Sequence, residues 1–116
     1  MSSASPPTRL HGGAERLPLR WANHAAPPLT ISRYRVAPGD AVSLHVHTGK
    51  AEYWVIIAGS GLVTVGDDEI PVAEGDIVAT PPAMPHGLVN TGRTPLVFIN
   101  VVQPLGDEPI TTTEVG

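Results

Sequence analysis

Apolar and polar residues alternate in short runs through most of the chain, a pattern typical of β-strands that bury one face. Gly, Pro and Asp residues separate the runs and favour tight turns. This frequent punctuation argues against long helices. Eight strands are predicted, over residues 29–36, 41–47, 52–58, 61–65, 69–72, 76–80, 86–90 and 95–102.

A chain of 116 residues is long enough for one domain and too short for two. The strands define an all-β domain at residues 29–103, and their number predicts an antiparallel sandwich or barrel, most commonly a jelly roll. Residues 1–28 are rich in Ser, Pro, Gly and Ala and are expected to be irregular, with a flexible first dozen. Residues 104–116 are expected to form a tail, with a possible edge strand at 110–115.

Strand parity predicts which side chains share a face. His45 and His47 lie two apart and point together, as do Glu52 and Trp54 on the next strand. The opposite faces of the two strands are apolar and carry Val42, Leu44, Val46, Tyr53, Val55 and Ile57. These faces predict a homodimer, with cover by the second sheet or by the N-terminal segment as the alternative.

The amino-acid composition excludes several kinds of ligand and partner. The chain has no cysteine, which excludes disulfides and thiolate ligands. Its net charge is −4 and its seven basic residues are scattered, so nucleic acid is not an expected partner. No apolar run approaches the roughly 18 residues of a membrane span, and the N-terminal residues lack signal-peptide features. A cytoplasmic location is therefore expected.

Three histidines and a glutamate lie within the predicted strands. His45 and His47 offer two imidazoles from one strand face, and Glu52 follows after a four-residue turn. His86 follows the stiff sequence Pro81-Pro82-Ala83-Met84-Pro85 and must be brought in by the fold. Imidazole and carboxylate ligands suit a divalent metal of borderline hardness. Spacing alone leaves open whether these histidines bind metal or are ordinary surface and core residues.

Two motifs resemble those of the cupin superfamily. Gly39-(x5)-His45-x-His47-(x4)-Glu52-(x6)-Gly59 matches the first cupin motif at every position. The second motif is matched by Gly75, Pro81, His86 and Asn90, but Ala83 stands where the family has glycine. The departure removes the expectation of a glycine-type backbone in that turn and leaves the ligands unaffected.

The resemblance implies a cupin-type double-stranded β-helix, or jelly-roll barrel, and a dimer. It also implies one divalent metal ion, drawn from Fe, Mn, Ni, Cu and Zn, held by His45, His47, Glu52 and His86. Four protein ligands leave one or two coordination positions open, as in a catalytic metal site.

Other residues are candidates for catalysis or substrate binding. Glu52, Tyr53 and Trp54 are the candidate catalytic group, with Tyr53 as a possible base. The candidate substrate-binding residues are Arg33, Arg35, Trp54, Met84 and Leu88. Arg33 or Arg35 would clamp a carboxylate if their face lined the cavity, and would otherwise be solvated. Trp54 and Leu88 have core packing as their alternative role.

Function is open among three classes, because cupins span enzymes, sensors and storage proteins. The first hypothesis is an oxygen-using dioxygenase-type oxidoreductase that acts on a small organic substrate. The second is a non-redox isomerase, epimerase, cyclase or lyase, which lacks an obvious general base. The third is a module that binds a small ligand without turnover.

Overall fold

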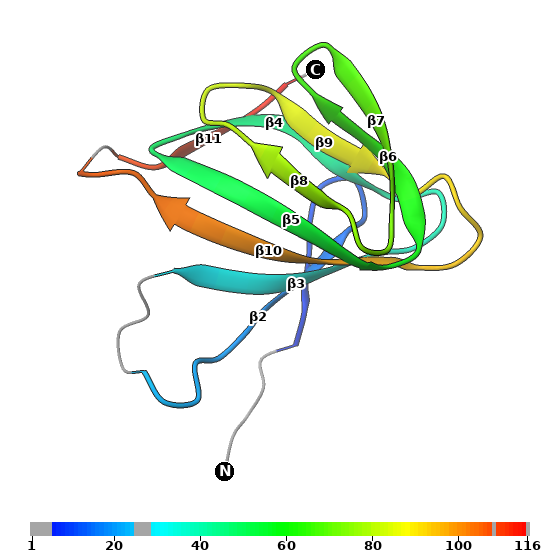
Figure 1. Ribbon diagram of the computed structural model, residues 1–116, viewed down its shortest axis with the longest axis horizontal. Coiled ribbons are helices and arrows are strands. Elements are labelled where there is room, and N and C mark those ends of the chain that lie inside the picture. The colour runs from blue at the N-terminus through cyan, green and yellow to red at the C-terminus, as the bar shows by residue number, and fades with distance from the viewer. Residues whose placement is uncertain (1–5, 25–28, 108, 116) are drawn as a thin grey trace.

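The computed structural model describes residues 6–24, 29–107 and 109–115, which form two antiparallel sheets. The six-stranded sheet has the order β1-β2-β3-β10-β5-β8, and the five-stranded sheet has the order β11-β4-β9-β6-β7 (Figure 1). The strands are β1 (Thr8–Arg9), β2 (Glu15–Pro18), β3 (Thr30–Val36), β4 (Ala41–Thr48), β5 (Lys50–Ala58), β6 (Ser60–Val65), β7 (Asp68–Ala73), β8 (Ile77–Thr80), β9 (His86–Val89), β10 (Leu96–Pro104) and β11 (Thr111–Glu114). The described residues contain no helix. They therefore include no helix that is long and apolar enough to cross a membrane.

The eight predicted strands correspond to β3 to β10, and the all-β jelly-roll class is confirmed. One detail is corrected: the two sheets are separate hydrogen-bonded ladders and do not close into a single barrel. The chain crosses between them at short turns, such as Gly49 between β4 and β5.

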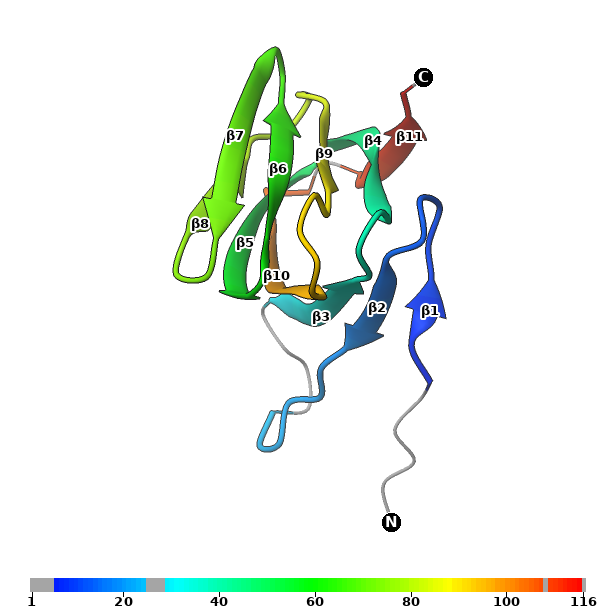
Figure 2. The same ribbon diagram turned by 90° about the vertical axis from the view of Figure 1, so that its right-hand side faces the viewer.

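The N-terminal region is more regular than expected. β1 pairs with β2, and β2 extends the larger sheet beside β3 (Figure 2). Gly13 also bridges to Ala41. The expectation of an irregular segment is therefore corrected for these strands, while residues 1–5 and 25–28 lie outside the described residues. At the other end of the chain, β11 forms the edge of the smaller sheet beside β4.

The core lies between the two sheets. Its largest fully buried side chains include Trp54, Phe98, Ile56, Leu88 and Leu96. Burial of side chains of this size contributes about 1.5–3 kcal/mol each and is the main force holding the sheets together. The polar residues His86, Glu52 and Asn100 are buried as well, at one end of this core.

Candidate metal centre

A β-bulge in β4 turns the first two histidines inward. Val42 pairs with Leu88 and His45 pairs with His86, so three residue steps on β4 oppose two on β9. The extra residue reverses the alternation between Val42 and His45. Val42 is consequently buried and lines the same cavity as His45 and His47, which corrects its expected place on the outer face.

Gly87 on β9 faces the bulge and allows the close approach. A Cβ atom at this position would lie 3.0 Å from the carbonyl oxygen of Val42 and 3.2 Å from the backbone of Leu44. A side chain there would push β4 away from β9. The bulge and the glycine together set the separation of His45 from His86.

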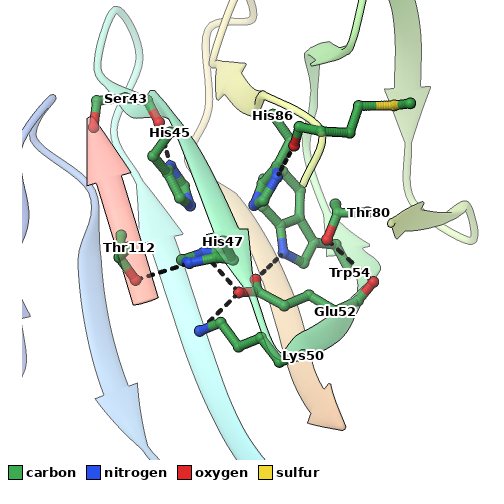
Figure 3. A network of polar contacts seen from close by, with 10 residues as sticks. Ser43, His45, His47, Lys50, Glu52, Trp54, Thr80, His86 and Thr112 are labelled. Atoms are coloured by element: carbon green, nitrogen blue, oxygen red, sulfur yellow. Dashed lines mark hydrogen bonds and ion pairs between the residues drawn. The ribbon is translucent and has the colours of Figure 1, made fainter. Parts of the chain in front are cut away.

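The three histidine rings converge on one point (Figure 3). Their centroids are 4.4 Å apart for His45 and His47, 4.3 Å for His45 and His86, and 5.0 Å for His47 and His86. One nitrogen from each ring can be chosen such that all three lie within 4.8 Å of one another. Such a group can hold a metal ion.

Each ring is held through its Nδ1 atom. Nδ1 lies 2.6 Å from the Ser43 carbonyl oxygen in His45, 2.8 Å from Thr112 Oγ1 in His47 and 3.1 Å from the Met84 carbonyl oxygen in His86. In His45 and His86 the carbonyl partner requires a proton on Nδ1, which leaves Nε2 with its lone pair free, the arrangement of metal-binding histidines. His47 differs, because its Nε2 lies against Glu52 and the Thr112 hydroxyl can donate to its Nδ1. The Nε2 atom of His86 is buried and has no hydrogen-bond partner among the described residues.

The loop before His86 is fastened to β4. Ala83 N–H donates to the His47 carbonyl oxygen at 2.7 Å. Ala83 has φ 62°, the left-handed conformation that glycine adopts without strain. The turn therefore keeps the glycine-type backbone despite the alanine.

Glu52 is held by three neighbours. Its Oε2 lies 2.9 Å from His47 Nε2 and 3.1 Å from Lys50 Nζ, and its Oε1 accepts a hydrogen bond of 3.2 Å from Trp54 Nε1 (Figure 3). Burial raises the pKa of Glu52, but the hydrogen bond from His47 and the charge of Lys50 outweigh it and lower the pKa. The carboxyl is therefore ionised and lies against one of the three histidines.

His45 and His86 are neutral at physiological pH. Burial lowers the pKa of His45, and it lowers the pKa of His86 to about 4. Neutral imidazole is the form that ligates metals. The unpartnered Nε2 of His86 and the converging rings fit a divalent metal, whose identity this donor set does not select.

The centre opens into a cavity of about 390 Å³. On the side of the smaller sheet it is lined by β4 and β11, including His45, His47 and Thr112. The facing wall is built from β2, β3, β10 and β5 of the larger sheet and includes Arg16, Tyr34 and Asn100. Lys50 also lines the cavity, and its side chain is only 14% exposed.

Some of the candidate residues lie away from the cavity. Arg33 and Arg35 are exposed on the face of β3 opposite Tyr34 and do not line the cavity, which agrees with the solvated alternative and removes them from the candidate substrate-binding residues. Tyr53 is 38% exposed and its hydroxyl donates to Gln103 Oε1 at 3.3 Å, which removes it from the candidate catalytic group.

The remaining candidates pack in or around the core. Met84 is exposed, and its side chain lies over Gly66 instead of the cavity. Leu88 is buried in the core cluster and does not line the cavity. Trp54 is also core, but its ring lies 5.5 Å from His86 and its N–H reaches Glu52. Its place is behind the site, where it positions Glu52.

Several residues of the cavity are not among the candidates from the sequence, and they include Lys50, Thr112, Arg16 and Asn100. The parity of β3 separates Tyr34 from the two arginines but does not say which face is inside. Lys50 shares a face with Glu52, which was an available signal. Nothing local to Arg16, Asn100 or Thr112 marks them, because sheet pairing alone brings them to the cavity.

Comparison with known proteins identifies the family. The family model described as Cupin domain matches residues 32–102, and the chain belongs to the cupin family. The chain is 34% identical over 72 residues to an oxalate-binding protein of Thermotoga maritima, and 37% identical over 75 residues to a mannose-1-phosphate guanylyltransferase of Klebsiella pneumoniae.

Solved structures agree on the fold. A Thermotoga maritima protein described as a predicted oxalate decarboxylase has a TM-score of 0.76 and 28% sequence identity, covering 85% of this chain and 92% of that one. A cupin 2 conserved barrel protein of Rhodopseudomonas palustris has a TM-score of 0.73 at 22% identity, covering 96% of this chain and 71% of that one.

The match to the curated relatives is partial. It covers 62% of this chain and 60% of the oxalate-binding protein, and 65% of this chain but only 16% of the guanylyltransferase. The family and fold are therefore shared, while the relatives' activities belong to those proteins.

Proposed function

We propose that this protein is a metal-dependent enzyme that oxidises a small organic substrate with dioxygen, in the manner of a dioxygenase. The observation that carries the proposal is the convergence of three histidines beside an ionised Glu52 at an open cavity. A closed structural site would not need a cavity of about 390 Å³ in front of it.

His45, His47 and His86 would hold the metal, with Glu52 as the fourth ligand. A redox-active metal bound there would supply the activation of dioxygen and the electron transfer. The protein's own contribution is orientation. Thr112 fixes the ring of His47, while Trp54 and Lys50 hold the carboxylate of Glu52.

A non-redox isomerase or lyase is the second candidate, and Lys50 favours it. Its ammonium group lies in the cavity 3.1 Å from Glu52, where a substrate proton could be exchanged. Lys50 is a proton-bearing group outside the ligand set and is not among the candidates from the sequence. Ligand binding without turnover is the third candidate, favoured by the name of the oxalate-binding relative.

Metal analysis followed by oxygen uptake tests the proposal. Protein purified without added metal is analysed for transition metals, then loaded anaerobically with Fe(II) and mixed with oxygen and a panel of small hydroxy, keto and dicarboxylic acids that includes oxalate. We expect about one metal per chain and oxygen uptake that depends on one substrate. Oxygen uptake should vanish in His86→Ala and persist in His24→Ala, which alters a histidine outside the site.

Each other result favours another class. A loaded protein that converts a substrate without consuming oxygen supports the isomerase or lyase. Tight binding of a small acid without any conversion supports the binding module. Either result would overturn the dioxygenase proposal.

We also infer a homodimer, on the basis of the apolar outer face of the larger sheet. Tyr53, Ile57 and Ile77 are exposed there, with Ile77 at 68%. Light scattering at micromolar concentration should give twice the chain mass of 12.1 kDa, and Ile77→Lys should shift the protein toward monomer. A monomeric wild-type protein would contradict the inference.

A further inference from the structure

The cavity wall that faces the histidines carries a polar cluster with no part in metal binding. Arg16 on β2 pairs directly with Tyr34 on β3, and Asn100 on β10 pairs with Ser32 on β3. All four residues line the cavity. The register of three strands therefore gathers a guanidinium, a phenol and an amide opposite the candidate metal centre.

Asn100 has an unsatisfied acceptor. The residue is 3% exposed, and its Oδ1 accepts no hydrogen bond from the described part of the chain. A buried carbonyl oxygen without a donor is destabilising, so such an atom at a cavity wall favours a ligand that brings an O–H or N–H group.

The phenol of Tyr34 is held rigidly. Its ring stacks on Phe98 at 4.7 Å, and Phe98 stacks on Trp54 at 4.8 Å. Burial and the charge of Glu52 raise the pKa of Tyr34, while Arg16 and Asn100 act in the opposite direction. Tyr34 is therefore a neutral O–H donor at physiological pH, fixed in place by the aromatic stack.

Arg16 is the cation available to an anionic ligand. No ion pair among the described residues involves Arg16, whereas Lys50 is engaged by Glu52. A guanidinium and a phenol side by side suit a carboxylate, which accepts hydrogen bonds from both. The acceptor of Asn100 suits a donor group carried by the same molecule.

We propose that Arg16, Tyr34 and Asn100 form the substrate subsite and select a small hydroxy acid. Its carboxylate is bound by Arg16 and the Tyr34 hydroxyl, and its hydroxyl group donates to Asn100 Oδ1. The inference rests on the proposed function, since it assigns the substrate class of the same cavity.

Matched pairs of acids test the subsite. Zn(II)-loaded protein, with metal content measured for every sample, is titrated calorimetrically with glycolate against acetate and with L-lactate against propionate. Each pair differs chiefly by one hydroxyl group. The hydroxy acid should bind at least about tenfold more tightly in the wild-type protein, because it alone satisfies Asn100.

Variants separate the two contacts. Asn100→Leu should lower the preference for the hydroxy acid to about one without changing the metal content, because the acceptor is gone. Arg16→Gln should weaken both acids of a pair about tenfold and leave their ratio unchanged. Arg33→Gln is the matched control on the outer face and should change neither.

Three results would overturn the subsite. The first is equal binding of the two acids by the wild-type protein. The second is a preference for the hydroxy acid that survives in Asn100→Leu, which is the result expected if the zinc ion alone chelates the hydroxyl group. The third is unchanged affinities for both acids in Arg16→Gln. The Arg16→Gln test can be made even if Asn100→Leu does not fold, because Arg16 is exposed and its replacement leaves the core unchanged. Failure of the proposed function would instead be seen as absent oxygen uptake with the binding ratios intact.

Discussion

The two walls of the cavity are built in different ways. The candidate metal ligands come from β4 and from the starts of β5 and β9, with His45, His47 and Glu52 within eight residues of chain. The facing wall takes Arg16 and Tyr34 from the consecutive strands β2 and β3 and Asn100 from the distant strand β10. A compact motif thus encodes the metal-binding chemistry, whereas strand register encodes the chemistry that would choose a substrate.

The difference also concerns hydrogen bonding. On the histidine wall each Nδ1 has an oxygen partner that orients its ring. On the facing wall Asn100 Oδ1 is left without a partner. The candidate metal ligands are therefore oriented by hydrogen bonds to their Nδ1 atoms, whereas the proposed subsite keeps one acceptor free for a ligand.

Removal of His86 should have the largest effect. His86→Ala deletes the ring that joins β9 to the other two histidines, and we expect metal loading to be lost while the fold remains. Inductively coupled plasma mass spectrometry measures the loading, with Arg16→Gln as the control from the facing wall. Full metal content in His86→Ala would show that the ligands lie elsewhere.

Acid should destabilise the metal-free protein through the same residue. An unfolded histidine is protonated near pH 6.5, whereas folded His86 is protonated only near pH 4, so the unfolded state holds the extra proton between these values. The stability contributed by neutral His86 is complete above pH 6.5 and is lost as the pH falls. Chelator-treated protein should lose about 3 kcal/mol of unfolding free energy between pH 6.5 and pH 4 from this residue.

Urea unfolding followed by tryptophan fluorescence measures this dependence. His86→Asn, which cannot titrate in this range, should show a shallower fall with acid. An identical pH dependence in both proteins would contradict the burial of a neutral imidazole.

Loss of the hydroxyl behind His47 should have an intermediate effect. Thr112→Val removes the oxygen 2.8 Å from His47 Nδ1 and should weaken metal affinity about 10–100-fold. Thr113→Val alters the next residue of β11 and should leave the affinity unchanged. Competition with a chromophoric chelator gives both values, and equal affinities would show that β11 does not orient the ring.

The smallest effect is expected at the turn before His86. Ala83→Gly relieves the left-handed backbone of Ala83 and should stabilise the protein by about 0.5–1 kcal/mol. Thermal unfolding of the metal-free protein measures the change. Destabilisation would show that the turn prefers another conformation.

The contrast between a local motif and long-range strand pairing explains which features could be predicted from the sequence. Strand positions and the jelly-roll class follow from alternation and turn residues, and the histidine set follows from local spacing together with the cupin motifs. The inward turn of Val42 could not be predicted, since a bulge in β4 reverses the parity.

Pairing between distant strands accounts for the remaining differences. The sequence leaves open whether Arg33 and Arg35 face the cavity, because parity fixes which residues share a face but not which face is inside. β2 was missed because residues 15–18 form a strand only by joining the edge of β3.

X-ray absorption spectroscopy of the metal-loaded protein tests the central claim most directly. The account predicts a first shell at about 2.0–2.2 Å that contains three imidazole nitrogens together with carboxylate oxygen. It also predicts that the imidazole count falls in His86→Ala loaded under excess metal. A shell of oxygen atoms alone, or one that is unchanged in that variant, would contradict it.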